Sequence, residues 1–144
     1  MSRRVLAIDY GRKRVGLAWS DELGVIASPI DALDNDKHLV KKVVSFIIDN
    51  EIEKVVVGIP LKMSGDEGEL SQEIKDFVNS LRNELKGVEF VFIDESLTSK
   101  DAEKIYFEKF RRFPKTHSEK YVIDSYAAAI ILQEYLDSKR GSYE

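Results

Sequence analysis

Hydrophobic residues along the chain occur in two patterns, short unbroken runs and longer stretches with helical spacing. Unbroken apolar runs of this length are typical of strands buried between neighbours in a sheet. Pro29 falls inside one run, and because proline cannot donate to a sheet ladder, that strand is expected near a sheet edge. The runs predict five strands, over residues 5–8, 15–19, 24–30, 54–60 and 88–95.

Apolar residues spaced by three and four predict helices between and after these strands. Asn35 or Asp36 is expected to cap the first helix, and Gly87 is expected to end the second as its C′ residue. The turn-rich segment 61–69 and the basic, aromatic segment 110–117 are expected to be loops. The helices are predicted over residues 39–48, over 70–85, from an N-cap at Thr98, and over 118–137.

The order of elements, βββαβαβαα, predicts an α/β fold with one five-stranded mixed sheet, strand order 3-2-1-4-5, and helices on both faces. The first three strands form an antiparallel meander, and the fourth lies parallel to the first. Gly11 is expected to take a positive φ in the first hairpin, whose tip carries Arg12, Lys13 and Arg14. Because no linker, repeat or low-complexity stretch interrupts the sequence, residues 1–144 are expected to form a single domain.

The composition narrows the class of protein. The 144 residues contain no cysteine, which excludes disulfides, thiolate zinc sites and cysteine nucleophiles. With no apolar run long enough for a membrane span and no signal-peptide core, the sequence indicates a cytoplasmic protein with no membrane partner. The net charge of −4 argues against non-specific coating of nucleic acid. Carboxylates that hold metal ions also make a chain acidic, however, and bound cations restore attraction for phosphate.

Three acidic residues are candidates for the chemistry. Asp9 follows a buried strand and Glu95 ends another, at the sheet end where open α/β sheets bind ligands. Asp124 interrupts an apolar helical face on which alanines permit close packing. A carboxylate there requires a partner, either a metal ion or a salt bridge, for which Lys120 is the nearest candidate. Asp9 could also serve only the turn, and Asp94 replaces Glu95 if the register differs by one residue.

Carboxylates that converge in this way repel one another unless cations bind between them. Ligands made only of oxygen favour Mg²⁺ or Mn²⁺, and a pair of such ions is a standard device for phosphodiester hydrolysis. The trio Asp9, Glu95 and Asp124 therefore predicts a nuclease centre with two ions, at which no side chain is the nucleophile.

Basic residues flank the predicted centre. Arg12 and Arg14 at the hairpin tip are either a solvated turn or contacts for phosphate, and Arg14 could instead orient Asp9. Further candidates for binding nucleic acid precede or begin the last helix, and they are Arg111, Arg112, Lys115 and Lys120.

Over nearly its whole length the chain resembles the YqgF/RuvX proteins of the RNase H-like superfamily. The matching motifs are Ala7-Ile8-Asp9-Tyr10-Gly11 with Arg14 and Gly16, Val56 to Leu61 with Gly65, Asp94 to Ser99 with Ala102, and Ile123-Asp124-Ser125 with Ala127, Ala128, Ile131 and Leu132. The resemblance implies the RNase H-like fold, with Asp9, Glu95 and Asp124 at the family's acidic metal-binding positions. The approach to the last helix departs from the family, since residues 116–120 keep one basic side chain, Lys120.

The resemblance also implies a function, a nuclease that matures the 5′ end of pre-16S ribosomal RNA, or by analogy a Holliday-junction resolvase. The expected partners are precursor rRNA and ribosomal particles in the first case and branched DNA in the second. A non-catalytic RNA- or ribosome-binding module with the same fold is the alternative from another class. An actin-like ATPase begins with a similar strand and hairpin but needs two domains. Monomer and homodimer both remain open.

Overall fold

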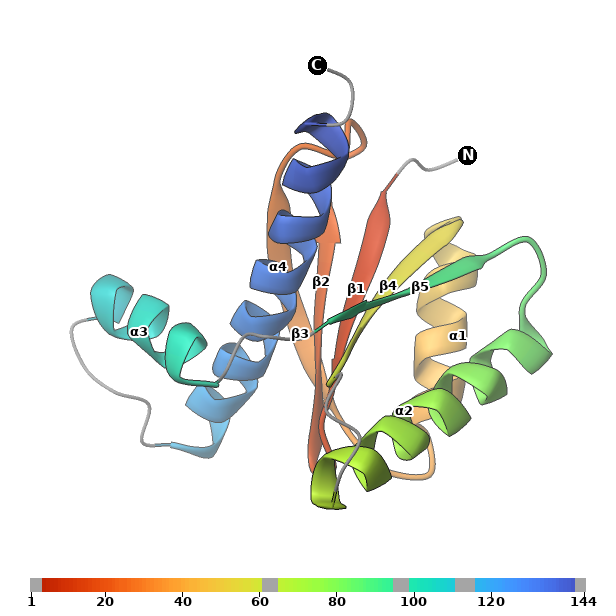
Figure 1. Cartoon of the computed structure of the whole chain (residues 1–144), viewed down its shortest axis with the longest axis horizontal. Helices are drawn as coiled ribbons and strands as arrows, with labels where there is room; N and C mark the ends of the chain where they lie inside the picture. Colours follow the sequence, from red (N-terminus) through yellow and green to blue (C-terminus); the bar gives the residue numbers. More distant parts are fainter. Residues whose placement is uncertain (1–3, 61–64, 95–98, 111–115, 142–144) are drawn as a thin grey trace.

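The computed structural model describes residues 4–60, 65–94, 99–110 and 116–141. Five strands form one sheet in the order β3-β2-β1-β4-β5, in which β1 pairs antiparallel with β2 and parallel with β4 (Figure 1). This confirms the predicted mixed sheet and its strand order. The elements are β1 (Val5–Tyr10), β2 (Arg14–Ser20), β3 (Ala27–Asp34), α1 (Leu39–Asp49), β4 (Lys54–Ile59), α2 (Gly65–Glu84), β5 (Glu89–Asp94), α3 (Ser99–Phe110) and α4 (His117–Gly141).

Helices cover both faces of the sheet, as predicted. Figure 1 shows α1 and α2 on one side, and α4 with α3 beside it on the other. Successive side chains of a strand point to opposite faces, and β1 divides accordingly. Leu6 and Ile8 pack with α1 and α2, whereas Val5 and Ala7 pack with α4. Among the helices of the described ranges, none has the length and apolar character needed to cross a membrane.

The helix α4 lies very close to the sheet. A Cβ added to Gly16 of β2 would overlap the backbone oxygen of Asp124 on α4, so only glycine allows this approach. Ala128 of α4 is buried against Ala7 and Ala18 of the sheet, which confirms the expected close packing, whereas Ala127 packs with Ala102 of α3. Glycine and alanine thus set the distance between α4 and β2 and fix the place of Asp124 over the sheet.

Side chains of α4 also bind the edge strand β3. The side-chain carbonyl of Gln133 accepts the backbone N–H of Ala27 at 2.9 Å, and its amide donates to the carbonyl of Val25 at 2.9 Å. About two helical turns earlier, the Ser125 hydroxyl donates to the carbonyl of Ile30. Backbone groups that would otherwise be unpaired at an edge are satisfied in this way.

We expect Gln133→Ala to lower the free energy of unfolding by about 1–3 kcal/mol, because it removes two hydrogen bonds to backbone at the start of the edge strand and just before it. Urea denaturation followed by circular dichroism measures this loss. Glu134→Ala, at the exposed neighbouring position, is the matched control and is expected to stay within about 0.5 kcal/mol of the parent chain. Equal stabilities for the two variants would contradict the role given to Gln133.

Several predicted boundaries are wrong. The third strand runs over Ala27–Asp34 rather than 24–30, and its pairing with β2 contains a register shift between Val15 and Leu17. The helix α2 begins at Gly65, so part of the predicted loop 61–69 is helical. It ends at Glu84, so Gly87, with a φ of +72°, lies in the following turn and not at C′.

The predicted cap of α1 is also wrong. The residue at the N-cap is His38, whose side chain makes no capping bond. Asp36 instead accepts the backbone N–H of His38 at 2.9 Å, and the Asn35 amide donates to the carbonyl of Gly11 at 2.8 Å. Both side chains therefore hydrogen-bond to backbone groups in loops. Such local bonds are an alternative to capping a helix for Asn and Asp. The predicted cap Thr98 lies outside the described residues.

Candidate functional site

Asp9 lies near the carboxyl end of β1, on the face that α4 covers. It is half-buried. Alternate residues of a strand share one face of the sheet, so Asp9 is on the same face as Val5 and Ala7, which pack against α4. Its cross-strand partner is Gly16 of β2. Partners in an antiparallel pair lie about 4.5–5.5 Å apart at Cα, so Asp9 stands directly beside Gly16.

Asp124 reaches the same place from α4. Its backbone packs on Gly16, which is the residue opposite Asp9. Two acidic residues separated by more than a hundred positions in the sequence therefore both lie beside one glycine. The close packing of α4 on β2 at Gly16 brings the backbone of Asp124 next to the strand position opposite Asp9.

The side chain of Asp124 is paired with Arg14, not with Lys120. The Nε of Arg14 donates to Oδ2 of Asp124 at 2.6 Å, with side-chain exposures of 20% and 26%. Arg14 lies two residues before Gly16 and so shares its face of β2, directly below α4. Lys120 is exposed, one turn before Asp124 on the helix. Lys120 does lie one helical turn from Asp124, as the spacing predicted, but the cation that pairs with Asp124 is Arg14 of strand β2.

The electrostatics of Asp124 favour an additional cation. Burial raises the pKa of Asp124 above its ordinary value of 3.8, and the hydrogen bond and charge of Arg14 offset that rise only in part. A carboxylate in this state gains from a further positive charge nearby. Together with Asp9, it offers the hard oxygen donors that Mg²⁺ and Mn²⁺ prefer, so the two residues fit such an ion.

Glu95, the predicted third metal ligand, lies outside the described residues. So do three of the predicted basic residues, Arg111, Arg112 and Lys115. Among the ranges that the structure describes, no group of three or more histidine, aspartate or glutamate side chains is arranged to hold a metal ion.

The last described residue of β5, Asp94, is exposed. Phe90 packs with the core under α1 and α2, while Val91 and Ile93 pack with the α4 layer. By alternation Asp94 is therefore on the face opposite Asp9.

The basic hairpin tip is held differently from the prediction. A Cβ at Gly11 would lie 2.5 Å from the carbonyl oxygen of Arg14, and the glycines with positive φ in the described part of the chain are Gly24 and Gly87. Gly11 is therefore needed for space and not for a left-handed turn. Arg12 forms an exposed ion pair with Glu73 of α2 at 2.9 Å, which links the hairpin to that helix.

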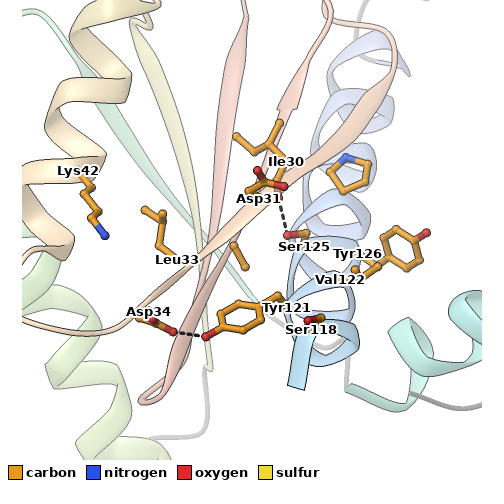
Figure 2. Close-up of a pocket in the computed structure, with 12 residues that line it drawn as sticks. Ile30, Asp31, Leu33, Asp34, Lys42, Ser118, Tyr121, Val122, Ser125 and Tyr126 are labelled. Atoms are coloured by element: carbon orange, nitrogen blue, oxygen red, sulfur yellow. Dashed lines mark hydrogen bonds between the residues drawn. The ribbon is translucent and has the colours of Figure 1, made fainter. Parts of the chain in front are cut away.

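Two residues near the site were missed by the sequence reasoning. The ring of Tyr121 lies beside Arg14, with 5.6 Å between the guanidinium carbon and the ring centre, and its hydroxyl donates to Asp34 (Figure 2). Both residues border a cavity of about 610 Å³ between β3 and α4. The signal for Tyr121 was its place three residues before Asp124, whereas Asp34 lay beyond the predicted end of its strand.

Comparison with known proteins agrees with this fold. Residues 3–138 match the model of the RuvX family, described as Holliday junction resolvase. A protein of Sulfurihydrogenibium sp. strain YO3AOP1 is 40% identical over 142 residues, which cover 98% of this chain and 94% of that protein. One from Dictyoglomus thermophilum is 36% identical over 137 residues, covering 94% and 96%. Both bear the name "Putative pre-16S rRNA nuclease".

Solved structures with similar folds share little sequence with the chain. RuvC of T. thermophilus in complex with a Holliday junction substrate has a TM-score of 0.60 at 15% identity, covering 96% of each chain. The Fowlpox virus resolvase in complex with Holliday junction DNA has a TM-score of 0.55 at 12% identity, covering 94% of this chain and 97% of the viral one. These likenesses confirm the predicted RNase H-like fold. On the match of the family model and the identity to its relatives, the chain belongs to the RuvX family.

Proposed function

We propose that this protein is a metal-dependent endonuclease that hydrolyses phosphodiester bonds, with the 5′ end of pre-16S ribosomal RNA as its substrate. The observation that carries the proposal is the meeting of Asp9 and Asp124 around Gly16, at the carboxyl end of β1. A pair of carboxylates in which one is partly buried and incompletely neutralised is suited to binding a hard divalent cation.

In this proposal Asp9, Asp124 and Glu95 would hold Mg²⁺ or Mn²⁺. An ion bound there would supply an activated water and charge stabilisation for the leaving 3′ oxygen. The support for Glu95 comes from the residues before it in β5, because Val91 and Ile93 lie in the α4 layer that Asp9 also faces. The chain's own part is to hold the carboxylates ionised and in place, and Arg14 does this for Asp124.

Basic side chains near the site are proposed to contact phosphates of the nucleic acid. Lys120 is exposed on α4, one turn before Asp124, and Arg12 lies at the exposed hairpin tip. Arg111, Arg112 and Lys115 complete the proposed set from the sequence. Since the described elements join one sheet and its covering helices, we propose that residues 1–144 form one nuclease domain, and an rRNA substrate implies that it works in the cytoplasm.

Holliday-junction resolution is the second candidate, favoured by the description of the matching family model. The two functions differ in symmetry. Cutting a junction at two related points calls for a two-fold dimer with paired sites, whereas trimming one RNA end does not. The names of the two relatives favour the RNA substrate.

The purified chain should be tested against a 5′-extended pre-16S RNA, an unrelated single-stranded RNA and a four-way DNA junction, in Mg²⁺ and in Mn²⁺, with its mass measured in parallel. We expect cleavage in the 5′ extension of the precursor. Paired cuts in the junction by a dimer, with intact RNA, would instead establish the resolvase function. Binding to the precursor without cleavage in either metal would identify a non-catalytic RNA-binding module.

A further inference from the structure

Four side chains form a line of contacts from the edge of the sheet to the candidate metal site. Asp34, the last residue of β3, accepts the hydroxyl of Tyr121 on α4 (Figure 2). The Tyr121 ring lies beside the guanidinium of Arg14, 5.6 Å from its centre. Arg14 in turn donates from Nε to Oδ2 of Asp124 at 2.6 Å. We call Asp34, Tyr121 and Arg14 the bracket.

The backbone holds the members of the bracket close together. Arg14 and Asp34 are paired across β2 and β3, so the edge strand fixes their separation. Tyr121 and Asp124 are three residues apart on α4, which places both side chains on one face of the helix. Because each member is anchored in a strand or helix, the guanidinium has little freedom to leave the carboxylate.

The contact between Arg14 and Asp124 uses one oxygen of the carboxylate. Arg14 binds Oδ2, and in the ranges that the structure describes Oδ1 receives no hydrogen-bond donor. This arrangement is typical of carboxylates that ligate metals, since one oxygen is held by an outer hydrogen bond while the other faces the ion.

We propose that Arg14, held by Tyr121 and Asp34, is a positioning residue that fixes Oδ2 of Asp124 and leaves Oδ1 for a divalent cation. The inference rests on the proposed function and deepens it, because it assigns Arg14 to the carboxylate instead of to a phosphate. It also gives Tyr121 and Asp34, which lie outside the acidic trio, a defined part in metal binding.

Calorimetric titration of the intact chain with Mn²⁺ tests the proposal. Arg14→Gln is expected to weaken Mn²⁺ binding by about 10–100-fold, as loss of an outer hydrogen bond to a ligand does. Arg14→Lys keeps the charge and is expected to bind more tightly than Arg14→Gln. Arg82→Gln is the matched control, since Arg82 is exposed on α2, on the other side of the sheet from Asp124, and it is expected to bind like the parent chain. Equal or tighter binding by Arg14→Gln would overturn the proposal.

A double-mutant cycle tests whether Tyr121 acts through Arg14. Tyr121→Phe keeps the ring and removes the hydroxyl bonded to Asp34, so it is expected to weaken Mn²⁺ binding by about two- to tenfold. In the Arg14→Gln background the same change is expected to have no further effect. Additive losses would overturn the link through Arg14. Thermal unfolding of each variant shows whether the folded chain was the species titrated.

Failure of the inference and failure of the proposed function have different signatures. If Asp124→Asn weakens Mn²⁺ binding and Arg14→Gln does not, the metal site stands and the bracket is refuted. If neither Asp9→Asn nor Asp124→Asn changes Mn²⁺ binding, the metal site itself is refuted, and the bracket with it.

Discussion

Asp9→Asn is expected to lower Mg²⁺-dependent cleavage by more than about 100-fold while leaving the fold intact. The substitution preserves shape but removes the charge that a hard cation requires, and losing a direct ligand costs more than losing an outer hydrogen bond, itself about 10–100-fold. Asp9 is half-buried beside Gly16, so the isosteric amide fits the same space. Single-turnover cleavage of precursor RNA, with thermal unfolding of the same preparation, measures both effects.

Asp94→Asn is the matched control for this substitution. Asp94 also ends a strand of the same sheet, but it is exposed and lies on the opposite face from Asp9 by the alternation of β5. We expect its cleavage rate to equal that of the parent chain. Parent-like cleavage by folded Asp9→Asn would remove Asp9 from the chemistry and with it the proposed nuclease centre.

Gly16→Ala is expected to disrupt stability and the site together. The added methyl group would overlap the backbone oxygen of Asp124, so α4 must move away from β2. Overpacking of this kind costs about 1–3 kcal/mol, and contact with an unyielding backbone favours the upper end. Because the shift separates Asp124 from Asp9, Mn²⁺ binding should be lost as well. Urea denaturation and calorimetry measure the two losses.

Gly24→Ala separates general destabilisation from damage to the site. Gly24 has a φ of +72° and open space around its Cβ position, so alanine there costs about 1–2 kcal/mol through backbone strain alone. It lies in the turn after β2, away from Asp9 and Asp124, and Mn²⁺ binding should be unchanged. If Gly16→Ala resembled Gly24→Ala in both measurements, the packing of α4 on Gly16 would not position the carboxylates.

The architecture was predictable because each strand carries its own local signal. An unbroken apolar run from Val5 to Ile8 indicated a strand covered on both faces, and alternation then placed Asp9. The ends of elements followed less well, since turn residues such as Asp36 bond to nearby backbone in more than one way. The extension of β3 to Asp34 depends on its pairing with Arg14, a contact made only in the folded sheet.

The sequence pointed to Asp9 and Asp124, but the contacts that these two residues make could not be predicted from it. A carboxylate on the apolar face of a helix requires a partner, and the nearest cation in the sequence was Lys120. The partner is Arg14, 110 residues away, because β2 passes directly beneath α4. Gly16 looked like one glycine within a strand, and its role emerges only when the backbone of Asp124 is seen against it. The spacing of residues along the sequence does not predict contacts between elements that are far apart in it.

Binding of a divalent ion between Asp9 and Asp124 is tested most directly by Mn²⁺-induced paramagnetic broadening of backbone amide signals. We expect early and selective loss of the signals of Asp9, Gly16 and Asp124, which lie together around the site, and no such loss in Asp9→Asn. Selective loss around the acids that border another hollow, Asp36, Glu73 and Asp76, with the signals of Asp9 and Asp124 unaffected, would contradict it.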